Sequence, residues 1–87
     1  MARPPKERRV EYLPAVTVFK PAGLPKAALE EVVLTVEELE AVRLKDLERM
    51  EQEDCAAKMR ISRPTFQRIL GTARAKIADA LINGKGL

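Results

Sequence analysis

The sequence contains no histidine and no tryptophan, and its 87 residues include a single cysteine. The lack of histidine removes the side chain that most often serves as a general base or a metal ligand. One cysteine cannot form an internal disulfide, and it cannot build a zinc site by itself. We therefore expect a protein that is not an enzyme and that uses no cofactor or metal.

Long hydrophobic runs are also missing from this chain. No apolar run approaches the roughly 18 residues that are needed to cross a bilayer, and no hydrophobic signal segment follows the basic N-terminus. Aromatic residues make up only 3% of the sequence, so a small core must be built mainly from aliphatic side chains. These absences predict a cytoplasmic protein with one small domain and no membrane contact.

Charge is strongly segregated along the chain, although the net charge is only +3. Residues 1–26 carry six basic and two acidic side chains, residues 27–56 carry three and ten, and residues 57–87 carry seven and one. A phosphate-binding surface needs a local excess of positive charge, whatever the total. The two ends of the chain therefore favour nucleic-acid binding, with merely solvated helix faces as the alternative interpretation.

The chain divides into two predicted parts. Residues 1–33 form an N-terminal arm with an extended segment, because three prolines in the first 14 residues discourage regular structure. Residues 34–87 form a helical domain. Within the first part, residues 16–19 and 31–34 are apolar and are candidates for one short strand pair. Such a pair is weakly held unless it packs on helices or on a second copy of the chain.

The first helix is expected to begin after Thr35, because Glu38 follows three residues later and completes a capping box. The helix is continued by an apolar stripe at helical spacing, made of Val36, Leu39, Val42 or Arg43, Leu44 and Leu47. The acidic residues Glu37, Glu38 and Glu40 have no histidine or nucleophile near them in the sequence. We interpret them as solvated helix surface rather than as catalytic carboxylates.

Residues 52–71 have the pattern of a helix-turn-helix. Small Ala56 and Ala57 stand where a second helix could cross closely. Apolar residues stand at spacings that would bury the inner faces of two steeply crossing helices: Cys55, Met59, Ile61, Phe66 and Ile69. The earlier of these helices is expected from about Glu51 to Met59. At the turn, Arg60 stands where a positive φ is common, at a cost of roughly 1 kcal/mol for a residue other than glycine.

The last helix is predicted to be long. One apolar face continues for more than four turns through Phe66, Ile69, Leu70, Ala73, Ile77, Ala80 and Leu81. Asn83 and Gly84 then supply a stop signal. Two registers are open at its start: Ser62 caps the helix, or Arg63 caps it with Pro64 at the first helical position.

The outward positions of this last helix carry the candidate site. We expect three side chains to read base edges in the major groove, namely Arg63, Gln67 and Arg68. Four more are expected to position the protein on phosphates, namely Ser62, Thr65, Arg74 and Lys76. Additional minor-groove or backbone contacts are assigned to the basic arm residues Arg3, Lys6, Arg8 and Arg9.

Two other residues have competing interpretations. Phe66 has the chemistry to stack on a base, but it shares a face with apolar neighbours, which favours a role in the core. Cys55 is interpreted as a small buried residue between helices rather than as a redox sensor.

Several stretches carry a resemblance to known families. The pattern around the helix-turn-helix resembles the fourth conserved region of bacterial sigma factors, through Leu34-Thr35-x-x-Glu38-Leu39-Glu40-Ala41-Val42-Arg43-Leu44 and Ala73-Arg74-x-Lys76-Ile77-x-x-Ala80-Leu81. The whole chain more closely resembles a family of small prokaryotic proteins of uncharacterised function that are predicted to bind DNA. The marks of that family are Arg3-Pro4, Phe19-Lys20-Pro21-Ala22-Gly23, Leu29-Glu30, Ser62-Arg63, Thr65-Phe66, Ala80-Leu81 and Asn83-Gly84-Lys85.

The resemblance implies a mainly α fold of three or four helices, similar to sigma region 4, and a role in transcriptional regulation. Some relatives carry cysteines in the N-terminal arm, and some are fused to a domain associated with iron–molybdenum cofactor assembly. This chain has no cysteine in its arm, so a metal-sensing role does not follow for it.

These observations predict a sequence-specific protein that binds double-stranded DNA. A protein-interaction module is the alternative, in which the acidic first two helices bind a component of the transcription machinery. We also expect a homodimer that buries residues 16–19 or 31–34 together with the end of the last helix. Such a dimer would present two reading helices about 34 Å apart. The competing expectation is that the N-terminal segment covers these side chains within one chain.

Overall fold

The structure is a computed structural model that describes residues 9–11, 19–23 and 29–87. Over these residues the protein is mainly helical, as predicted, and contains no β-strand. The elements in chain order are α1 (Val36–Val42), the π-helical segment η2 (Arg43–Leu47), α2 (Gln52–Met59) and α3 (Arg63–Asn83). The described residues therefore contain three α-helices, in agreement with the mainly helical class that the sequence predicts.

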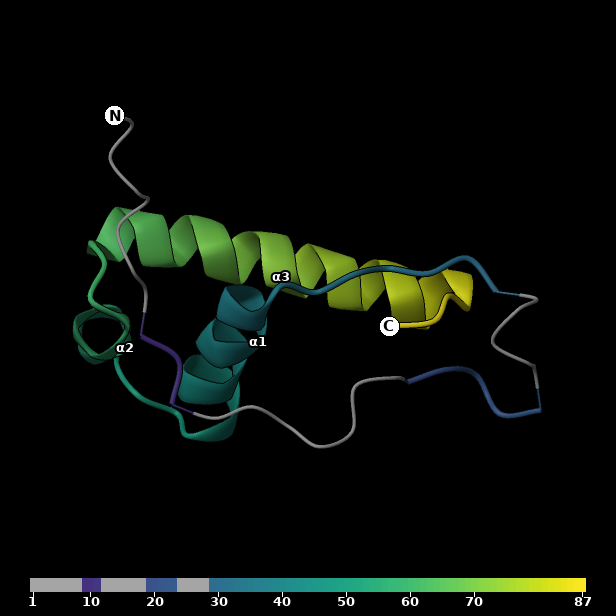
Figure 1. Ribbon diagram of the computed structural model, residues 1–87, viewed down its shortest axis with the longest axis horizontal. Coiled ribbons are helices and arrows are strands. Elements are labelled where there is room, and N and C mark those ends of the chain that lie inside the picture. The colour runs from purple at the N-terminus through teal and green to yellow at the C-terminus, as the bar shows by residue number, and fades with distance from the viewer. Residues whose placement is uncertain (1–8, 12–18, 24–28) are drawn as a thin grey trace, which may run out of the picture.

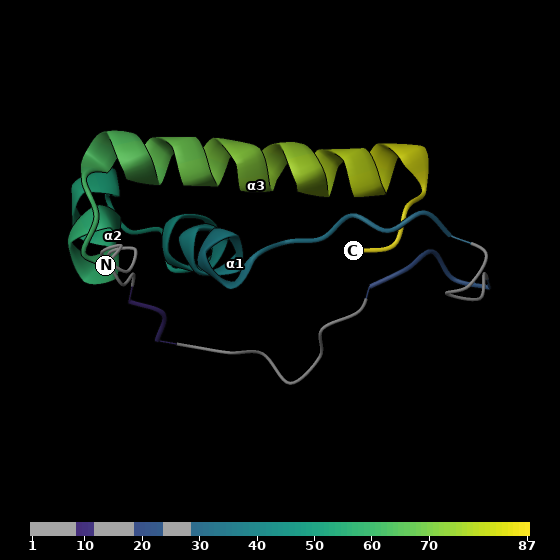
Figure 2. The same ribbon diagram turned by 45° about the horizontal axis from the view of Figure 1, so that its top comes forward.

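The helices form two layers. Helix α3 lies on one side of the molecule, and α1 and α2 pack beneath it (Figure 2). In Figure 1, α2 is seen nearly end-on below the first turns of α3, so these two helices cross steeply. The core between the layers consists of Ala41, Leu44, Cys55, Ala56, Met59, Phe66, Ile69 and Leu70. The predicted core positions of Phe66 and Cys55 are confirmed, whereas Ala57 is exposed.

Helix α1 begins at the predicted capping box. The Thr35 hydroxyl accepts a hydrogen bond from the Glu38 backbone N–H at 3.2 Å, and the Glu38 carboxylate accepts one from the Thr35 N–H at 2.8 Å. Two backbone donors that lack a helical partner are thereby satisfied. The capping signal in the sequence is confirmed.

The predicted apolar stripe of this helix is wrong at both ends. Leu44 is buried, but Leu47 is 73% exposed and Val36 is also exposed. The helix widens after Val42 into η2, where the Glu48 N–H bonds to the Arg43 carbonyl five residues earlier. A π-turn inserts an extra residue into the helical repeat. Leu47 consequently does not lie on the same helix face as Leu44, although regular α-helical spacing would have placed it there.

A turn of three residues joins α2 to α3. Arg60 adopts the predicted left-handed conformation, with φ 58° and ψ 44°. Ser62 is the N-cap of α3, because its hydroxyl accepts a hydrogen bond from the Thr65 N–H at 3.3 Å. The open question of register is thus answered in favour of Ser62, with Arg63 as the first helical residue.

Helix α3 ends at Asn83, and Gly84 follows with φ 66°, as the stop signal predicts. The apolar face is buried at most of its positions as far as Ala80, with Ile77 half-buried, but Leu81 is 76% exposed. Its predicted place on the core face is wrong, because each residue turns an α-helix by about 100°. Leu81 therefore points well away from the direction of Ala80.

The expected strand pair between the two N-terminal segments does not form over the described residues. Phe19 instead exchanges two backbone hydrogen bonds with Leu87, at 3.1 and 2.7 Å. Gly86 bonds to the Glu30 carbonyl at 2.9 Å and to the Val32 N–H at 2.7 Å. The two segments were expected to pair with each other. Phe19 and the residues around Glu31 bond to the C-terminal tail instead. Residues 16–18 of the expected pair lie outside the described part of the chain.

Candidate nucleic-acid interface

The start of α3 brings together five of the predicted contact residues, which are Ser62, Arg63, Thr65, Gln67 and Arg68. Four of them are exposed, and Thr65 is half-buried. On the same turns, Phe66, Ile69 and Leu70 are buried in the core. Burial of one face therefore fixes the direction in which the other face presents its polar side chains. We call these five residues the reading end of α3.

The reading end has a polar partner on α2 that sequence analysis did not identify. The Gln52 side-chain oxygen accepts a hydrogen bond from Arg63 Nε at 3.3 Å and another from Gln67 Nε2 at 2.8 Å. The neighbouring Glu53 carboxylate lies 3.5 Å from Arg63 Nη1. The sequence holds one signal for this role, because Gln52 precedes Ala56 by four residues and Met59 by seven. It is a polar residue on the helix face that meets α3.

Arg68 differs from the other cations of the helix. No residue in the described part of the chain accepts a hydrogen bond or forms an ion pair with its guanidinium. Its five N–H donors can therefore be offered to a ligand without breaking an internal contact.

Arg74 lies further along α3 and is held by a carboxylate. It donates two hydrogen bonds to Asp46, one of them from Nε at 3.1 Å and the other from Nη2 to Oδ1. The bonds from Arg74 lower the pKa of Asp46 although burial opposes this, and the same pairing raises the pKa of Arg74. We call α1 and η2 together the first helical segment. The pair of Arg74 and Asp46 joins the end of this segment to the middle of α3.

Lys76 is held in a similar way. Its ammonium group donates hydrogen bonds to Glu38 Oε1 and to the Val33 carbonyl, both at 2.8 Å. Glu38 is only 6% exposed, so its interpretation as solvated surface is wrong. Burial alone would raise the Glu38 pKa, but hydrogen bonds from Lys76 and from the Thr35 backbone outweigh it and lower that pKa. Lys76 thereby fastens α3 to the capping box of α1.

Glu40 is also buried, at 1% exposure, and its assignment to solvated surface is likewise wrong. Arg43 binds both of its oxygens, with Nε at 2.7 Å from Oε1 and Nη2 at 3.0 Å from Oε2. The Glu11 backbone N–H donates a third bond at 3.0 Å. Hydrogen bonding from Arg43 holds the pKa of Glu40 low against the effect of burial. One turn of helix places Arg43 beside Glu40, and the N-terminal segment completes the enclosure.

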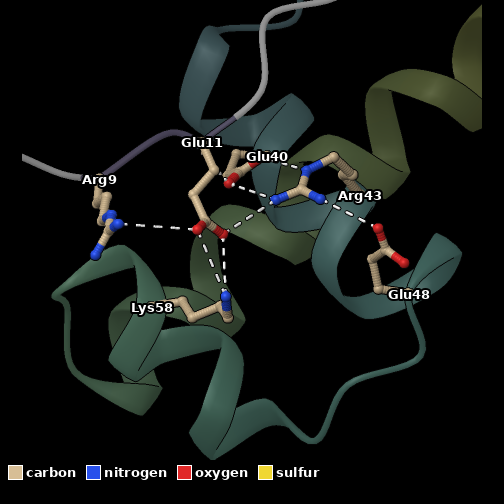
Figure 3. Close-up of polar contacts among 6 residues, drawn as sticks. All are labelled: Arg9, Glu11, Glu40, Arg43, Glu48 and Lys58. Atoms are coloured by element: carbon tan, nitrogen blue, oxygen red, sulfur yellow. Dashed lines mark hydrogen bonds and ion pairs between the residues drawn. The ribbon is translucent and has the colours of Figure 1, made fainter.

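The Glu11 side chain extends this network to α2. Figure 3 shows its carboxylate lying between Arg43 and Lys58, with each cation 3.3 Å from Oε1. The Arg9 backbone N–H also donates to the Met59 carbonyl at 3.1 Å, at the end of α2. Residues 9–11 are therefore anchored immediately before the turn that leads into α3. The other predicted arm contacts, Arg3, Lys6 and Arg8, lie outside the described residues.

Three further features of the described part of the chain concern other kinds of site, namely its metal-ligating residue types, its cysteine and the apolar character of its helices. It contains no group of three histidine, cysteine, aspartate or glutamate residues placed to hold a metal ion. Cys55 is free and buried, and burial raises the pKa of its thiol. None of the helices there combines the length and the apolar character that a membrane span requires.

The chain is similar over its whole length to several bacterial proteins named UPF0251. It is 69% identical to the protein of Moorella thermoacetica and 66% identical to that of Halothermothrix orenii, spanning 58% and 64% of their lengths. It is also 66% identical to UPF0251 protein TTE1845 of Caldanaerobacter subterraneus, of which it spans 74%. No solved structure matches the chain. The family described as "Protein of unknown function DUF134" matches residues 1–87, and the chain belongs to that family.

Proposed function

We propose that the protein binds double-stranded DNA in a sequence-specific manner. In this proposal α2, the turn and α3 act as a helix-turn-helix resembling sigma region 4, and α3 enters the major groove. The observation that carries the proposal is the reading end, where Arg63, Gln67 and Arg68 are exposed on the same turns that bury an apolar face in the core. Side chains of this kind on the first turns of the second helix are those that contact bases in such motifs.

The chemistry of the reading end matches base edges in the major groove. A guanidinium can donate two hydrogen bonds to guanine O6 and N7, which suits Arg68 with its uncommitted donors. A carboxamide can pair with adenine N6 and N7, which suits Gln67. Arg63 has the same guanidinium chemistry, but one of its donors is already bonded to Gln52.

The phosphate contacts are less evenly supported. The Ser62 hydroxyl donates to Thr65 Oγ1 at 2.9 Å, which leaves the Thr65 hydroxyl proton for a phosphate oxygen. Arg74 and Lys76 would have to share their donors with Asp46 and Glu38. We therefore place Thr65 and the basic arm before Arg74 and Lys76 in the proposed phosphate footprint.

Transcriptional regulation as a homodimer is part of the same proposal. Leu81 and Ile82 at the end of α3 are 76% and 83% exposed, and no described segment covers them. A two-fold dimer through this end would bury both side chains and provide two reading helices. Sedimentation equilibrium tests this part, and a single 9.7 kDa species at all micromolar concentrations would rule it out.

A salt titration of DNA binding tests the main proposal. Fluorescence anisotropy with a labelled duplex is expected to show affinity that falls steeply with salt, because bound lysine and arginine displace counterions. About four to seven phosphate contacts give a log–log slope of roughly −4 to −6. An affinity that is flat from low to moderate salt contradicts DNA binding and favours the alternative, in which the acidic surface binds a protein of the transcription machinery.

A further inference from the structure

In the contact between Gln52 and the reading end, Gln52 is the hydrogen-bond acceptor, and this assignment bears on which base Gln67 can recognise. We propose that Gln52 is a positioning residue that presets Gln67 to recognise adenine, an inference that rests on the proposed DNA-binding function. Gln52 lies at the start of α2, half-buried on the face that also carries buried Ala56 and Met59. Because the core holds this face against α3, the carboxamide of Gln52 approaches Gln67 from a fixed side.

The polarity of the contact follows from Arg63. A guanidinium has only N–H donors, so the Gln52 atom that Arg63 Nε meets at 3.3 Å must be the amide oxygen. The same oxygen lies 2.8 Å from the Gln67 carboxamide. It can therefore bond only to the NH2 group of Gln67, since two amide oxygens would repel each other. An obligate donor thus determines the orientation of both amides in turn.

This orientation leaves a defined pattern on Gln67. One of its two N–H groups is bonded to Gln52, while the other N–H and the oxygen remain for a ligand. Adenine presents the acceptor N7 beside the donor N6–H2 in the major groove, which pairs with one N–H and one oxygen. Guanine presents two acceptors there, N7 and O6, and would face the Gln67 oxygen with an acceptor. The preset amide accordingly favours adenine over guanine at its base position.

Arg63 has a different part in this arrangement from the one its sequence position predicts. Its Nε is used by Gln52, and its Nη1 lies 3.5 Å from Glu53. Its main contribution is then to fix the polarity of the Gln52 amide, while Arg68 supplies the uncommitted guanidinium of the reading end. The two arginines are five positions apart on one helix, but only Arg63 contacts α2.

Selection of bound duplexes from a randomised DNA pool tests the inference. The wild-type chain is compared with Gln67→Ala, Gln52→Ala and Gln52→Glu, and with Thr72→Ala as a control at an exposed α3 position outside the contact. Gln67→Ala is expected to reduce the adenine preference at one position by about 5–150-fold, the usual worth of a bidentate pair. Gln52→Ala is expected to reduce it at the same position by about 3–10-fold, a fraction of that range.

The conservative variant separates positioning from other roles of Gln52. A carboxylate still accepts from Arg63 and Gln67, so Gln52→Glu is expected to retain the adenine preference even where its added negative charge weakens binding to every sequence. A stability role or a phosphate contact of Gln52 would lower all affinities equally and leave base preference untouched. Thr72→Ala is expected to select the wild-type motif, and circular dichroism confirms that each variant is folded.

The outcomes distinguish this inference from the proposal on which it rests. A wild-type chain that selects no motif overturns both. A wild-type motif that Gln67→Ala leaves unchanged, or that Gln52→Ala alters at no position, overturns the role of Gln52 but retains DNA binding. Loss of the adenine preference in Gln52→Glu as well as in Gln52→Ala also overturns it, because the acceptor would then be irrelevant.

Discussion

The two halves of α3 are both basic, but they use their cations differently. In the first two turns, Arg68 has no acidic partner among the described residues, and Arg63 meets only the exposed Glu53 and the neutral Gln52. In the later turns, Arg74 binds Asp46 and Lys76 binds the buried Glu38. The first half can offer donors to a ligand, whereas the second half already uses its donors to hold the first helical segment.

The difference teaches that a run of basic residues overstates a phosphate-binding surface. Seven basic side chains in residues 57–87 suggest one continuous footprint. Lys58, Arg74, Lys76 and Lys85 are each paired with acidic groups elsewhere in the fold. We call Arg43, Arg74 and Lys76 the clamped cations, because carboxylates of the first helical segment hold them. Substitutions of the clamped cations and of the reading end are expected to separate stability from DNA affinity.

The largest effect is expected from the carboxylate that holds Arg43. Glu40→Gln removes a buried charge whose partner stays in place, and it is expected to lower the free energy of unfolding by about 2–4 kcal/mol. Urea denaturation measures the change. Glu48→Gln is the matched control, because it contacts the same guanidinium from an exposed position and is expected to cost less than about 0.5 kcal/mol. Equal losses in the two variants would contradict a special role for the buried pair.

The same substitution has a signature in pH. The Glu40 pKa is lowered from its ordinary value of 4.5, so its contribution to stability is complete above pH 4.5 and is lost as pH falls through the lower, folded pKa. The stability difference between wild type and Glu40→Gln is therefore expected to shrink below pH 4.5. A difference that stays constant down to pH 3 would show that ionisation of Glu40 is not its source.

A smaller effect is expected at the reading end, on DNA affinity rather than on stability. Arg68→Ala is expected to weaken binding to the selected DNA by about 1–3 kcal/mol and to relax one or two base positions. Its unfolding free energy should stay within about 0.5 kcal/mol of wild type, because the side chain has no hydrogen-bonding partner among the described residues. Anisotropy titrations and urea denaturation give the two values. Unchanged affinity and motif would reduce Arg68 to solvated surface.

Lys76→Ala is expected to lower stability and to leave DNA affinity almost unchanged, which is the reverse of Arg68→Ala and a smaller effect. It leaves the buried Glu38 with one hydrogen bond fewer, at a cost of about 1–2 kcal/mol in unfolding free energy. DNA affinity, measured where the variant is fully folded, is expected to change by less than about twofold, since Lys76 spends its donors internally. A uniform loss of affinity with a salt slope reduced by about 1 would instead rank Lys76 with the main phosphate contacts.

The smallest effect is expected for the pair of Arg74 and Asp46. Both side chains are exposed to a substantial degree, and such pairs contribute about 0.2–1 kcal/mol. A double-mutant cycle with Arg74→Ala and Asp46→Ala measures their coupling, which is expected to fall as salt is added. No coupling at low salt would mean that this pair, unlike Lys76 and Glu38, does not hold α3 in place.

Local signals in the sequence predicted the helices well. The capping box at Thr35, the left-handed turn at Arg60, the core position of Phe66 and the stop at Gly84 all depend on residues within one or two helical turns. Propensity, capping and turn chemistry act over such distances. These features could therefore be predicted without knowing how the helices pack.

The errors concern the burial of side chains, which depends on contacts between elements and on a local change of helix type. Glu38 and Glu40 look like surface residues until Lys76, Arg43 and the Glu11 N–H are brought to them. Leu47 follows the apolar stripe until the π-turn displaces it. A carboxylate is stable in a buried position only when donors compensate its lost hydration. Arg43 is a near neighbour of Glu40 in sequence, but Lys76 and the Glu11 N–H come from distant parts of the chain.

The sequence by itself determined where the first helix begins, where α3 ends, which face of α3 enters the core, and that the exposed face is basic. The tertiary structure alone decided which of those basic side chains are clamped, and it placed Gln52 against Arg63 and Gln67. The physical reason is the range of the interactions. Helix formation and capping are settled by neighbours in the chain, whereas ion pairs and hydrogen bonds between elements need atoms about 3 Å apart that only the packed fold brings together.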